Sequence, residues 1–435
     1  MNNKLRGKDF ILGLQHLFAM FGATVLVPVL TGLSVSSTLL FAGVGTLLFH
    51  LLTGRKVPAF LGSSFAFLGG YAAISNLCAE QGMSNFSAYA GIGVACAGLV
   101  YVILAILFKL FGANKVMRYF PPIVTGPIII SIGLTLSESA ISNCSSNWII
   151  ALAAIVTVII CNIWGKGMVK IVPILLGVIV SYLAAVVMRQ VDFTPVAEAK
   201  WIGLPVAFEN TVFSLFKDCN PSLVITSIIT IMPIAIATII EHIGDISAIS
   251  STVGKNFIAD PGLHRTLLGD GLATSLAALF GAPANTTYGE NTGVLALTKV
   301  YDPRVIRLAA IFAIILSLCP KFAAIIQVMP AATMGGISLI LYGMISAVGV
   351  RNVVEKHVDL SKSRNVIIAA LILVLAIGIK FGTEAQAIVF HIGEVSINLS
   401  GLAVAAIIGI LLNAVLPGKD YVFEGEEQTG VDFKV

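Results

Sequence analysis

Two carboxylates lie four residues apart inside a long apolar stretch, at Glu241 and Asp245. This spacing places both side chains on one face of a helix, one turn apart. Because two carboxylates in a dry site cannot both ionise cheaply, we expect one of them to hold a proton near neutral pH. Glu241 and Asp245 together then suit proton coupling, with Asp245, about one turn off centre, as a relay and Glu241 also suited to ligand contact. The plainer alternative is that both only hydrogen-bond neighbouring helices.

A third acidic residue, Glu290, follows Tyr288 and Gly289 at the expected start of a short helix. A carboxylate there can accept hydrogen bonds from ring N–H donors, and Gly289 lets a ligand approach backbone amides closely. Phe65 can stack on a flat ring, although ordinary packing is the default for any phenylalanine. Tyr342 is a weaker candidate for closing the site from the second half of the chain.

Three further ionisable residues fall in apolar segments, where a charge costs at least ~2.5 kcal/mol at mid-membrane. We interpret His16 as a supporting core residue rather than a ligand contact. His242 points about 100° away from Glu241 on a helix, so we expect it to hydrogen-bond a neighbouring helix. Asp270 is interpreted as a cap near the start of its helix.

The composition fixes the class of protein in which these residues must act. The chain has 435 residues, of which 57% are hydrophobic and 11% charged, and its mean hydropathy is +0.98. Average soluble domains carry about 25% charged residues. Apolar stretches long enough to cross ~30 Å of hydrocarbon recur along the chain. We therefore predict an all-α polytopic membrane protein, with the net charge of +4 in its loops and no nucleic-acid partner.

Motifs for catalysis are missing from the sequence. It has no G-x-x-x-x-G-K-[ST], no H-E-x-x-H and no G-x-S-x-G. The six cysteines are scattered without a C-x-x-C pair, which argues against a zinc site or a disulfide framework. We expect no enzyme activity, no cofactor and no metal. A membrane enzyme or a passive channel stays an alternative without a motif to support it.

We place fourteen apolar segments, which set the positions of these residues. The third and tenth are broken by Gly, Ser and Thr, and open on Pro58-Ala59 and Pro283-Ala284. The segments lie near 11–30, 37–53, 59–77, 87–111, 119–137, 147–164, 169–188, 222–249, 266–281, 284–298, 304–320, 327–349, 364–380 and 393–416.

Loop charges give the orientation. With the N-terminus inside, cytoplasmic loops hold 21 of the 26 Lys and Arg residues, a clear positive-inside bias. Both termini are then cytoplasmic, in a cell (inner) membrane. The long outside loop 190–221 joins residues 1–189 to residues 222–418, and a cytoplasmic tail 419–435 follows. Seven segments per half make the second half an inverted repeat of the first, which is a transporter architecture.

The two broken segments are the expected binding site. Their extended stretches can pair with each other as short strands, and the half-helices that follow then point their N-termini at the bilayer centre. Each backbone N–H or C=O group that has no partner within a helix costs several kcal/mol in lipid, unless it pairs with another segment or lines a cavity. Two kinked helices without a ligand are the simpler alternative.

At these residues the chain resembles the nucleobase–ascorbate transporter (nucleobase:cation symporter 2) family, and within it the bacterial branch that carries uracil. The resemblance covers essentially the whole chain. The segments that carry it are Gln15–Thr24, Gly62–Phe67, Glu241–Gly244 and Asn285–Gly293.

The resemblance implies a core domain (spans 1–4 and 8–11), a gate domain (spans 5–7 and 12–14), paired short strands in spans 3 and 10, and proton-coupled uptake of uracil by alternating access. It also implies a homodimer through the gate domains. Carried over by position, Glu241 and Glu290 hydrogen-bond the uracil ring, and the main chain near Phe65 and Gly289 contacts its polar edge. The neighbouring positions are Ser64, Tyr288 and Tyr342, with His16 and Asp270 in supporting places.

One residue departs from the uracil pattern. Asp245 stands where that branch has histidine, and aspartate here is similar to the purine-transporting branch. Glu290 fits the uracil branch, because the purine branch usually has glutamine there. The expected cargo is uracil, and the alternative is xanthine, uric acid or another purine.

Overall fold

The computed structural model describes residues 7–217, 219–392 and 395–418. Within these ranges it describes every side chain except those of Lys8, Ala113, Asn114, Glu290, Leu297, His391, Ile392 and residues 395–397.

The first half of the described chain is almost entirely helical. Its elements are α1 (Gly7–Thr31), α2 (Val35–Leu52), β1 (Leu61–Ser63), η1 (Phe65–Phe67), α3 (Leu68–Glu80), α4 (Phe86–Phe111), α5 (Ala113–Met117), α6 (Pro122–Ser145), α7 (Trp148–Ile163), α8 (Met168–Ile171) and α9 (Pro173–Val187). The connecting segment that follows contains α10 (Thr194–Glu198), η2 (Phe208–Asn210) and η3 (Val212–Phe216).

The second half again alternates long helices with one short strand before its final part. Its elements are α11 (Pro221–Ile231), η4 (Met232–Ile234), α12 (Ala235–Val253), η5 (Ile258–Gly262), α13 (Leu263–Leu279), β2 (Asn285–Thr287), α14 (Gly289–Thr298), α15 (Pro303–Ser317), α16 (Pro320–Gln327), α17 (Ala331–Glu355), α18 (Ser363–Gly382), β3 (Ala387–Ile392), β4 (Val395–Ser400) and α19 (Gly401–Val415).

Each of the fourteen predicted segments overlaps a helix. Among the described residues, seven helices are long and apolar enough to cross a membrane by themselves, or eight if α15 and α16, bent by 87°, form one span. Three shorter apolar helices, α7, α9 and α19, add to these. The chain is therefore a multi-pass membrane protein, and the count of fourteen crossings stays a prediction.

The last predicted segment, 393–416, is wrong as a continuous helix. Its described residues up to Ser400 belong to strand β4, which pairs antiparallel with β3, and α19 begins only at Gly401. The physical reason is visible in the sequence, because Val395, Ile397 and Leu399 alternate with polar residues at the period of a strand.

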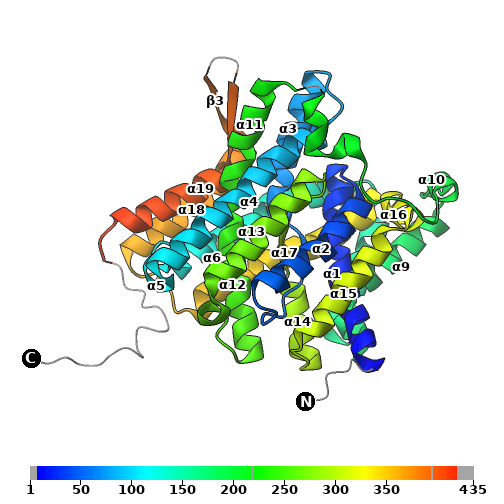
Figure 1. The fold of residues 1–435 in the computed structure, drawn as a ribbon, viewed down its shortest axis with the longest axis horizontal. Helices are drawn as coiled ribbons and strands as arrows, with labels where there is room; N and C mark the ends of the chain where they lie inside the picture. The colour runs from blue at the N-terminus through cyan, green and yellow to red at the C-terminus, as the bar shows by residue number, and fades with distance from the viewer. Residues whose placement is uncertain (1–6, 218, 393–394, 419–435) are drawn as a thin grey trace, which may run out of the picture.

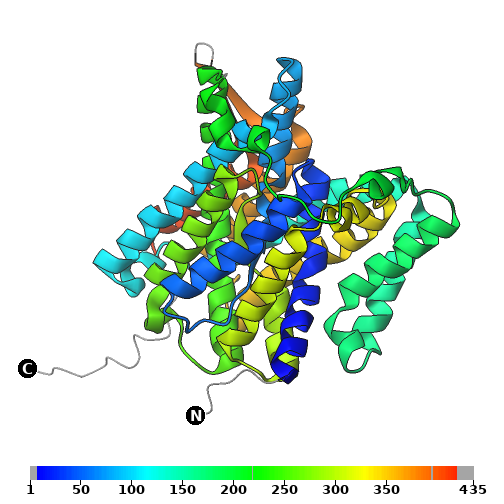
Figure 2. The same cartoon turned by 45° about the vertical axis from the view of Figure 1, so that its right-hand side comes forward.

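The helices form two sets that pack mainly among themselves. One set contains α1, α2, α4, α13 and α15, and the other contains α6, α7, α9, α17, α18 and α19. Figure 1 shows the β3–β4 hairpin at the opposite end of the molecule from the start of α1. Figure 2 shows the α7–α9 pair, in green-cyan, at the edge of the molecule away from α4.

Close helix crossings in both sets depend on glycines. In the first set, a Cβ on Gly98 of α4 would lie 2.5 Å from the carbonyl oxygen of Gly271 of α13. In the second, a Cβ on Gly349 of α17 would lie 2.8 Å from the carbonyl oxygen of Gly126 of α6. Small residues at such crossings let helix backbones approach, which is how helices associate in lipid without a hydrophobic driving force.

Candidate functional site

The two broken segments meet in the interior, where β1 pairs antiparallel with β2. Leu61 lies opposite Thr287, Gly62 opposite Thr286 and Ser63 opposite Asn285. All six residues are buried. A two-stranded sheet inside a helical membrane protein leaves outer backbone groups without strand partners, and these must be satisfied by the surrounding helices.

Side chains from α2 and α13 supply these partners. The Thr46 hydroxyl of α2 accepts a hydrogen bond from the Leu61 amide at 2.9 Å. The Thr274 hydroxyl of α13 donates to the Asn285 carbonyl oxygen, also at 2.9 Å. The strands are thereby fixed to the first helix set, and their position is set by packing rather than by sequence-local turns.

Tyr288 joins the end of β2 to β1. Its amide donates to the Phe60 carbonyl oxygen at 3.1 Å, and its hydroxyl donates to the Ser63 carbonyl oxygen at 2.7 Å. Its ring covers Gly62, where a Cβ would lie 2.5 Å from ring atom Cε2. In this structure Tyr288 therefore holds the two strands together.

This contact predicts a large effect of a single methyl group. The Gly62→Ala substitution places Cβ against the Tyr288 ring and 2.7 Å from Thr24 Oγ1, so the ring must move. Overpacking of this kind costs about 1–3 kcal/mol. We expect a lower midpoint of thermal unfolding in detergent. Gly69→Ala, which has no atom within 4 Å of the new methyl group, is the control, and an equal effect of both changes would contradict the argument.

Asp245 lies beside the beginning of the half-helix α14. Its Oδ2 accepts a hydrogen bond from Thr287 Oγ1 at 2.9 Å, and its Oδ1 lies 3.7 Å from the position of a Cβ on Gly289. Gly289 is the first residue of α14, whose N-terminal amides have no partners within the helix. Glu241, half-buried, is one turn earlier on α12, and the side chain of Glu290 lies outside the described residues.

Phe65 begins the other half-helix and touches the second helix set. Its ring packs edge-on against Tyr342 of α17, with 5.6 Å between the centroids and 77° between the planes. Next to it, Ser64 is fully buried, and its hydroxyl has no hydrogen-bond partner among the residues that the structure describes. A buried hydroxyl normally has a partner, so Ser64 Oγ is available to a polar ligand.

The predicted interhelical contact of His242 is confirmed. Its Nδ1 lies 2.9 Å from Asp270 Oδ2, and neither side chain is exposed to solvent. Asp270 is two turns inside α13, whose first residue is Leu263, so its interpretation as a helix cap is wrong. The prediction of a cap was wrong because the helix begins earlier than the apolar pattern indicated. The pair fixes α12, which carries Glu241, to α13.

Removing one partner of this pair is expected to destabilise the protein. Asp270→Leu leaves the buried His242 imidazole without its partner, and a buried polar group without a partner costs about 1–3 kcal/mol. Asp270→Asn keeps an oxygen in place and is expected to lose less than half as much. Chemical unfolding in mixed micelles measures both. No measurable loss of stability for Asp270→Leu would show that the contact contributes little.

His16 supports the site from α1. It is fully buried, and its Nδ1 and its carbonyl oxygen each lie 3.5 Å from Nδ2 of Asn291 on α14. The contact is long for a hydrogen bond, but it links α1 to the half-helix that begins at Gly289. This placement fits a supporting residue.

The structure thus brings Asp245 of α12 to the strand junction together with Tyr288 and Gly289, where β2 leads into α14. Ser64 and Phe65 lie where β1 leads into η1. Sequence reasoning missed Thr287, which contacts Asp245, and Asn291, which contacts His16. Both lie in the segment Asn285–Gly293. The polar residues of that segment were a usable signal, because hydroxyl and amide side chains in an apolar region need partners.

Comparison with known proteins identifies close relatives over nearly the full chain. Residues 7–385 match a family described as a permease family. The uracil permease of Bacillus caldolyticus is 40% identical over 427 residues, covering 96% of this chain and 94% of the relative. The uracil permease of Escherichia coli strain K12 is 37% identical over 434 residues, with coverage of 96% and 94%.

Solved structures share the fold at low sequence identity. The transmembrane domain of the cyanobacterial bicarbonate transporter BicA superposes with a TM-score of 0.59 at 16% identity, covering 95% of this chain and 99% of that one. The murine anion transporter Slc26a9 in its inward-facing state gives a TM-score of 0.60 at 10% identity, covering 95% and 69%. These likenesses concern the fold alone.

Proposed function

Because this chain belongs to the permease family of nucleobase–ascorbate transporters, we propose that it is a uracil permease, which takes up uracil together with protons by alternating access. Relatives that are 37–40% identical over more than nine-tenths of the chain are uracil permeases, which favours uracil over xanthine or uric acid. A transporter of this kind is not an enzyme.

The two helix sets correspond to the core and gate domains of our proposal. The first set and the strand junction form the core, and α6, α7, α9, α17, α18 and α19 form the gate. We propose fourteen crossings in two inverted halves, residues 1–189 and 222–418, joined by the outside linker 190–221. Both termini, including the tail 419–435, face the cytoplasm of a cell (inner) membrane, and two copies associate through their gates.

The observation that carries the proposal is the junction of the strands, where the Asp245 carboxylate borders the first residue of α14. Uracil offers two ring N–H donors and two carbonyl acceptors. In our proposal Glu241 and Glu290 accept from the ring, and the main chain near Phe65 and Gly289 donates to its carbonyls. A site that hydrogen-bonds its ligand in this way rejects analogues without those groups by several kcal/mol.

Three further residues complete the proposed site, and two carboxylates couple it to protons. Ser64 offers its unpartnered hydroxyl, Tyr288 holds the strands in place, and Tyr342 closes the site from the gate. Asp245 and Glu241, one turn apart, share the transported proton, because two such neighbours cannot both ionise cheaply.

Uptake of labelled uracil into proteoliposomes, in competition with other nucleobases, tests the cargo. We expect saturable uptake, accumulation driven by an inward proton gradient, and competition by unlabelled uracil. Stronger competition by xanthine or uric acid would favour the purine alternative. Uptake that neither saturates nor accumulates would indicate a channel.

A further inference from the structure

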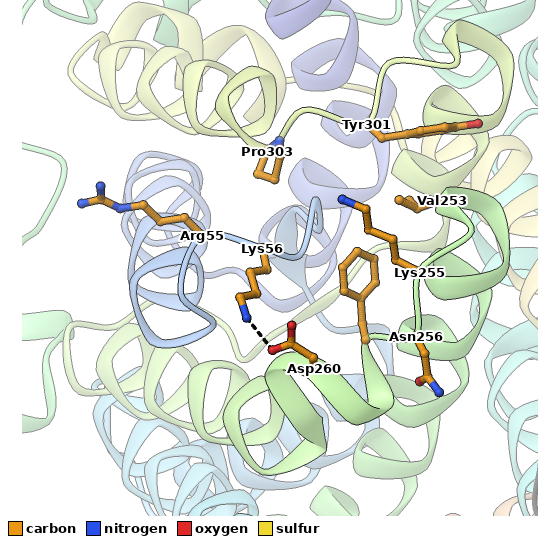
Figure 3. Close-up of a pocket in the computed structure, with 9 residues that line it drawn as sticks. Arg55, Lys56, Val253, Lys255, Asn256, Asp260, Tyr301 and Pro303 are labelled. Carbon is orange, nitrogen blue, oxygen red and sulfur yellow. Dashed lines mark hydrogen bonds and ion pairs between the residues drawn. The ribbon is translucent and has the colours of Figure 1, made fainter. Parts of the chain in front are cut away.

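A cavity of about 580 Å³ lies away from the strand junction, where three connecting segments meet. The segments follow α2, follow α12 and precede α15. The cavity is lined by Arg55, Lys56, Val253, Lys255, Asn256, Phe257, Asp260, Tyr301 and Pro303. Figure 3 shows Lys56 and Lys255 reaching into the space between these segments, while the Arg55 side chain extends away from its centre. All three segments are predicted to be cytoplasmic.

The segments are strongly basic. Residues 53–58, 253–265 and 298–307 together contain seven Lys and Arg residues and only two acidic residues. Both acids are already paired: Asp260 Oδ1 lies 2.5 Å from Lys56 Nζ, and Asp302 Oδ2 lies 2.6 Å from Arg304 Nη2. Among the described residues, Arg55 and Lys255 have no acid within ion-pair distance.

Two more guanidinium groups strengthen the positive field. Arg265 Nη1 lies 3.8 Å from the position of a Cβ on Gly54. Arg307, one turn after Pro303 on α15, lies within electrostatic range of Arg55, of Arg304 and of the acid Asp302. Its Nη1 is buried without a hydrogen-bond partner among the described residues. Like charges gathered around a cavity repel one another unless an anion lies between them.

We propose that this cavity binds a phosphate-bearing anion from the cytoplasmic side. A phosphate group offers several charged oxygens to lysine and arginine donors, and charge-assisted hydrogen bonds of this type are about twice as strong as neutral ones. The cavity is larger than a single inorganic ion needs, so there is room for the group that carries the phosphate. The chemistry is shared by a soluble phosphate compound and by the headgroup of an anionic lipid.

The position of the cavity gives such binding a consequence for transport. Lys56 is five residues before β1, Lys255 follows the helix that carries Glu241 and Asp245, and Tyr301 is three residues after the end of α14. An anion held between these segments would connect the three elements that build the strand junction. Occupancy is therefore expected to slow changes in their relative position.

The test compares Arg55→Gln/Lys255→Gln with the native protein. Lys115→Gln is the matched control, because it removes an exposed lysine from another predicted cytoplasmic segment, away from this cavity. Titration calorimetry in neutral detergent measures pyrophosphate binding, and native mass spectrometry from nanodiscs measures retention of phosphatidylglycerol against phosphatidylcholine. Retained uracil uptake shows that the variants are folded.

We expect the double variant to lose affinity at least tenfold for one of the two probes, and the control to stay within twofold of the native protein. A loss confined to pyrophosphate identifies a soluble ligand, and a loss confined to phosphatidylglycerol identifies a lipid. The proposal is overturned if the native protein binds neither probe, if the double variant binds both as well as the native protein does, or if Lys115→Gln weakens binding equally.

Discussion

The Glu241→Gln variant is expected to lose at least about 90% of uracil uptake. Glutamine has nearly the same shape, but it replaces one carboxylate oxygen by an NH2 group that faces the ring N–H donor. A hydrogen bond to a charged group contributes about 1.5–3 kcal/mol, which corresponds to a 10- to 150-fold change in affinity. Initial rates at uracil concentrations well below the native KM measure this loss.

Gly293→Ala is the control for that experiment. It changes α14 three residues after Glu290, at a position with no atom within 4 Å of the new methyl group. We expect uptake within about twofold of the native rate, because the substitution only favours the helix. If Glu241→Gln transported uracil as fast as Gly293→Ala, Glu241 could not be a ligand of the ring.

The Asp245→Asn variant is expected to separate uracil movement from proton movement. With one proton carried per uracil, a gradient of one pH unit supports about tenfold accumulation, because one unit corresponds to 1.36 kcal/mol. Asparagine can still accept from Thr287 but cannot release a proton. We therefore expect the accumulation ratio to fall to about one.

Exchange of internal for external uracil at equal pH provides the matching control, since it needs no net proton movement. We expect the Asp245→Asn variant to retain this exchange within about fivefold of the native rate. Accumulation that still followed the pH gradient in this variant would assign proton coupling to another group. Loss of both exchange and accumulation would mean that Asp245 is needed for binding itself.

Most of the helices could be predicted from the sequence, because a continuous apolar run long enough to cross the membrane nearly always forms a helix. It did not predict β3 and β4, since the apolar residues of Val395–Ser400 raise the hydropathy of the helix that follows and conceal a period of two. When hydropathy is averaged over a long stretch of sequence, a short alternation of apolar and polar residues no longer shows.

The candidate site was predictable in its residue types but not in its contacts. Placing a carboxylate inside the membrane costs free energy, so such residues are rare and indicate a functional site. Glu241 and Asp245 stand out in the sequence for this reason. Nothing local indicates that Asp270 meets His242, because that contact depends on how α12 packs on α13. The same holds for Thr287, whose partner is 42 residues away in the chain.

The edge-on contact between Phe65 and Tyr342 has a use that follows from where the two rings belong. Phe65 belongs to η1 beside the strand junction and Tyr342 belongs to α17 of the second helix set, so any movement of one relative to the other changes the separation of the two rings. The distance between the two rings therefore reports the relative position of the two segments that carry them. Spin labels or fluorophores placed next to these rings would report each turnover as a change in separation.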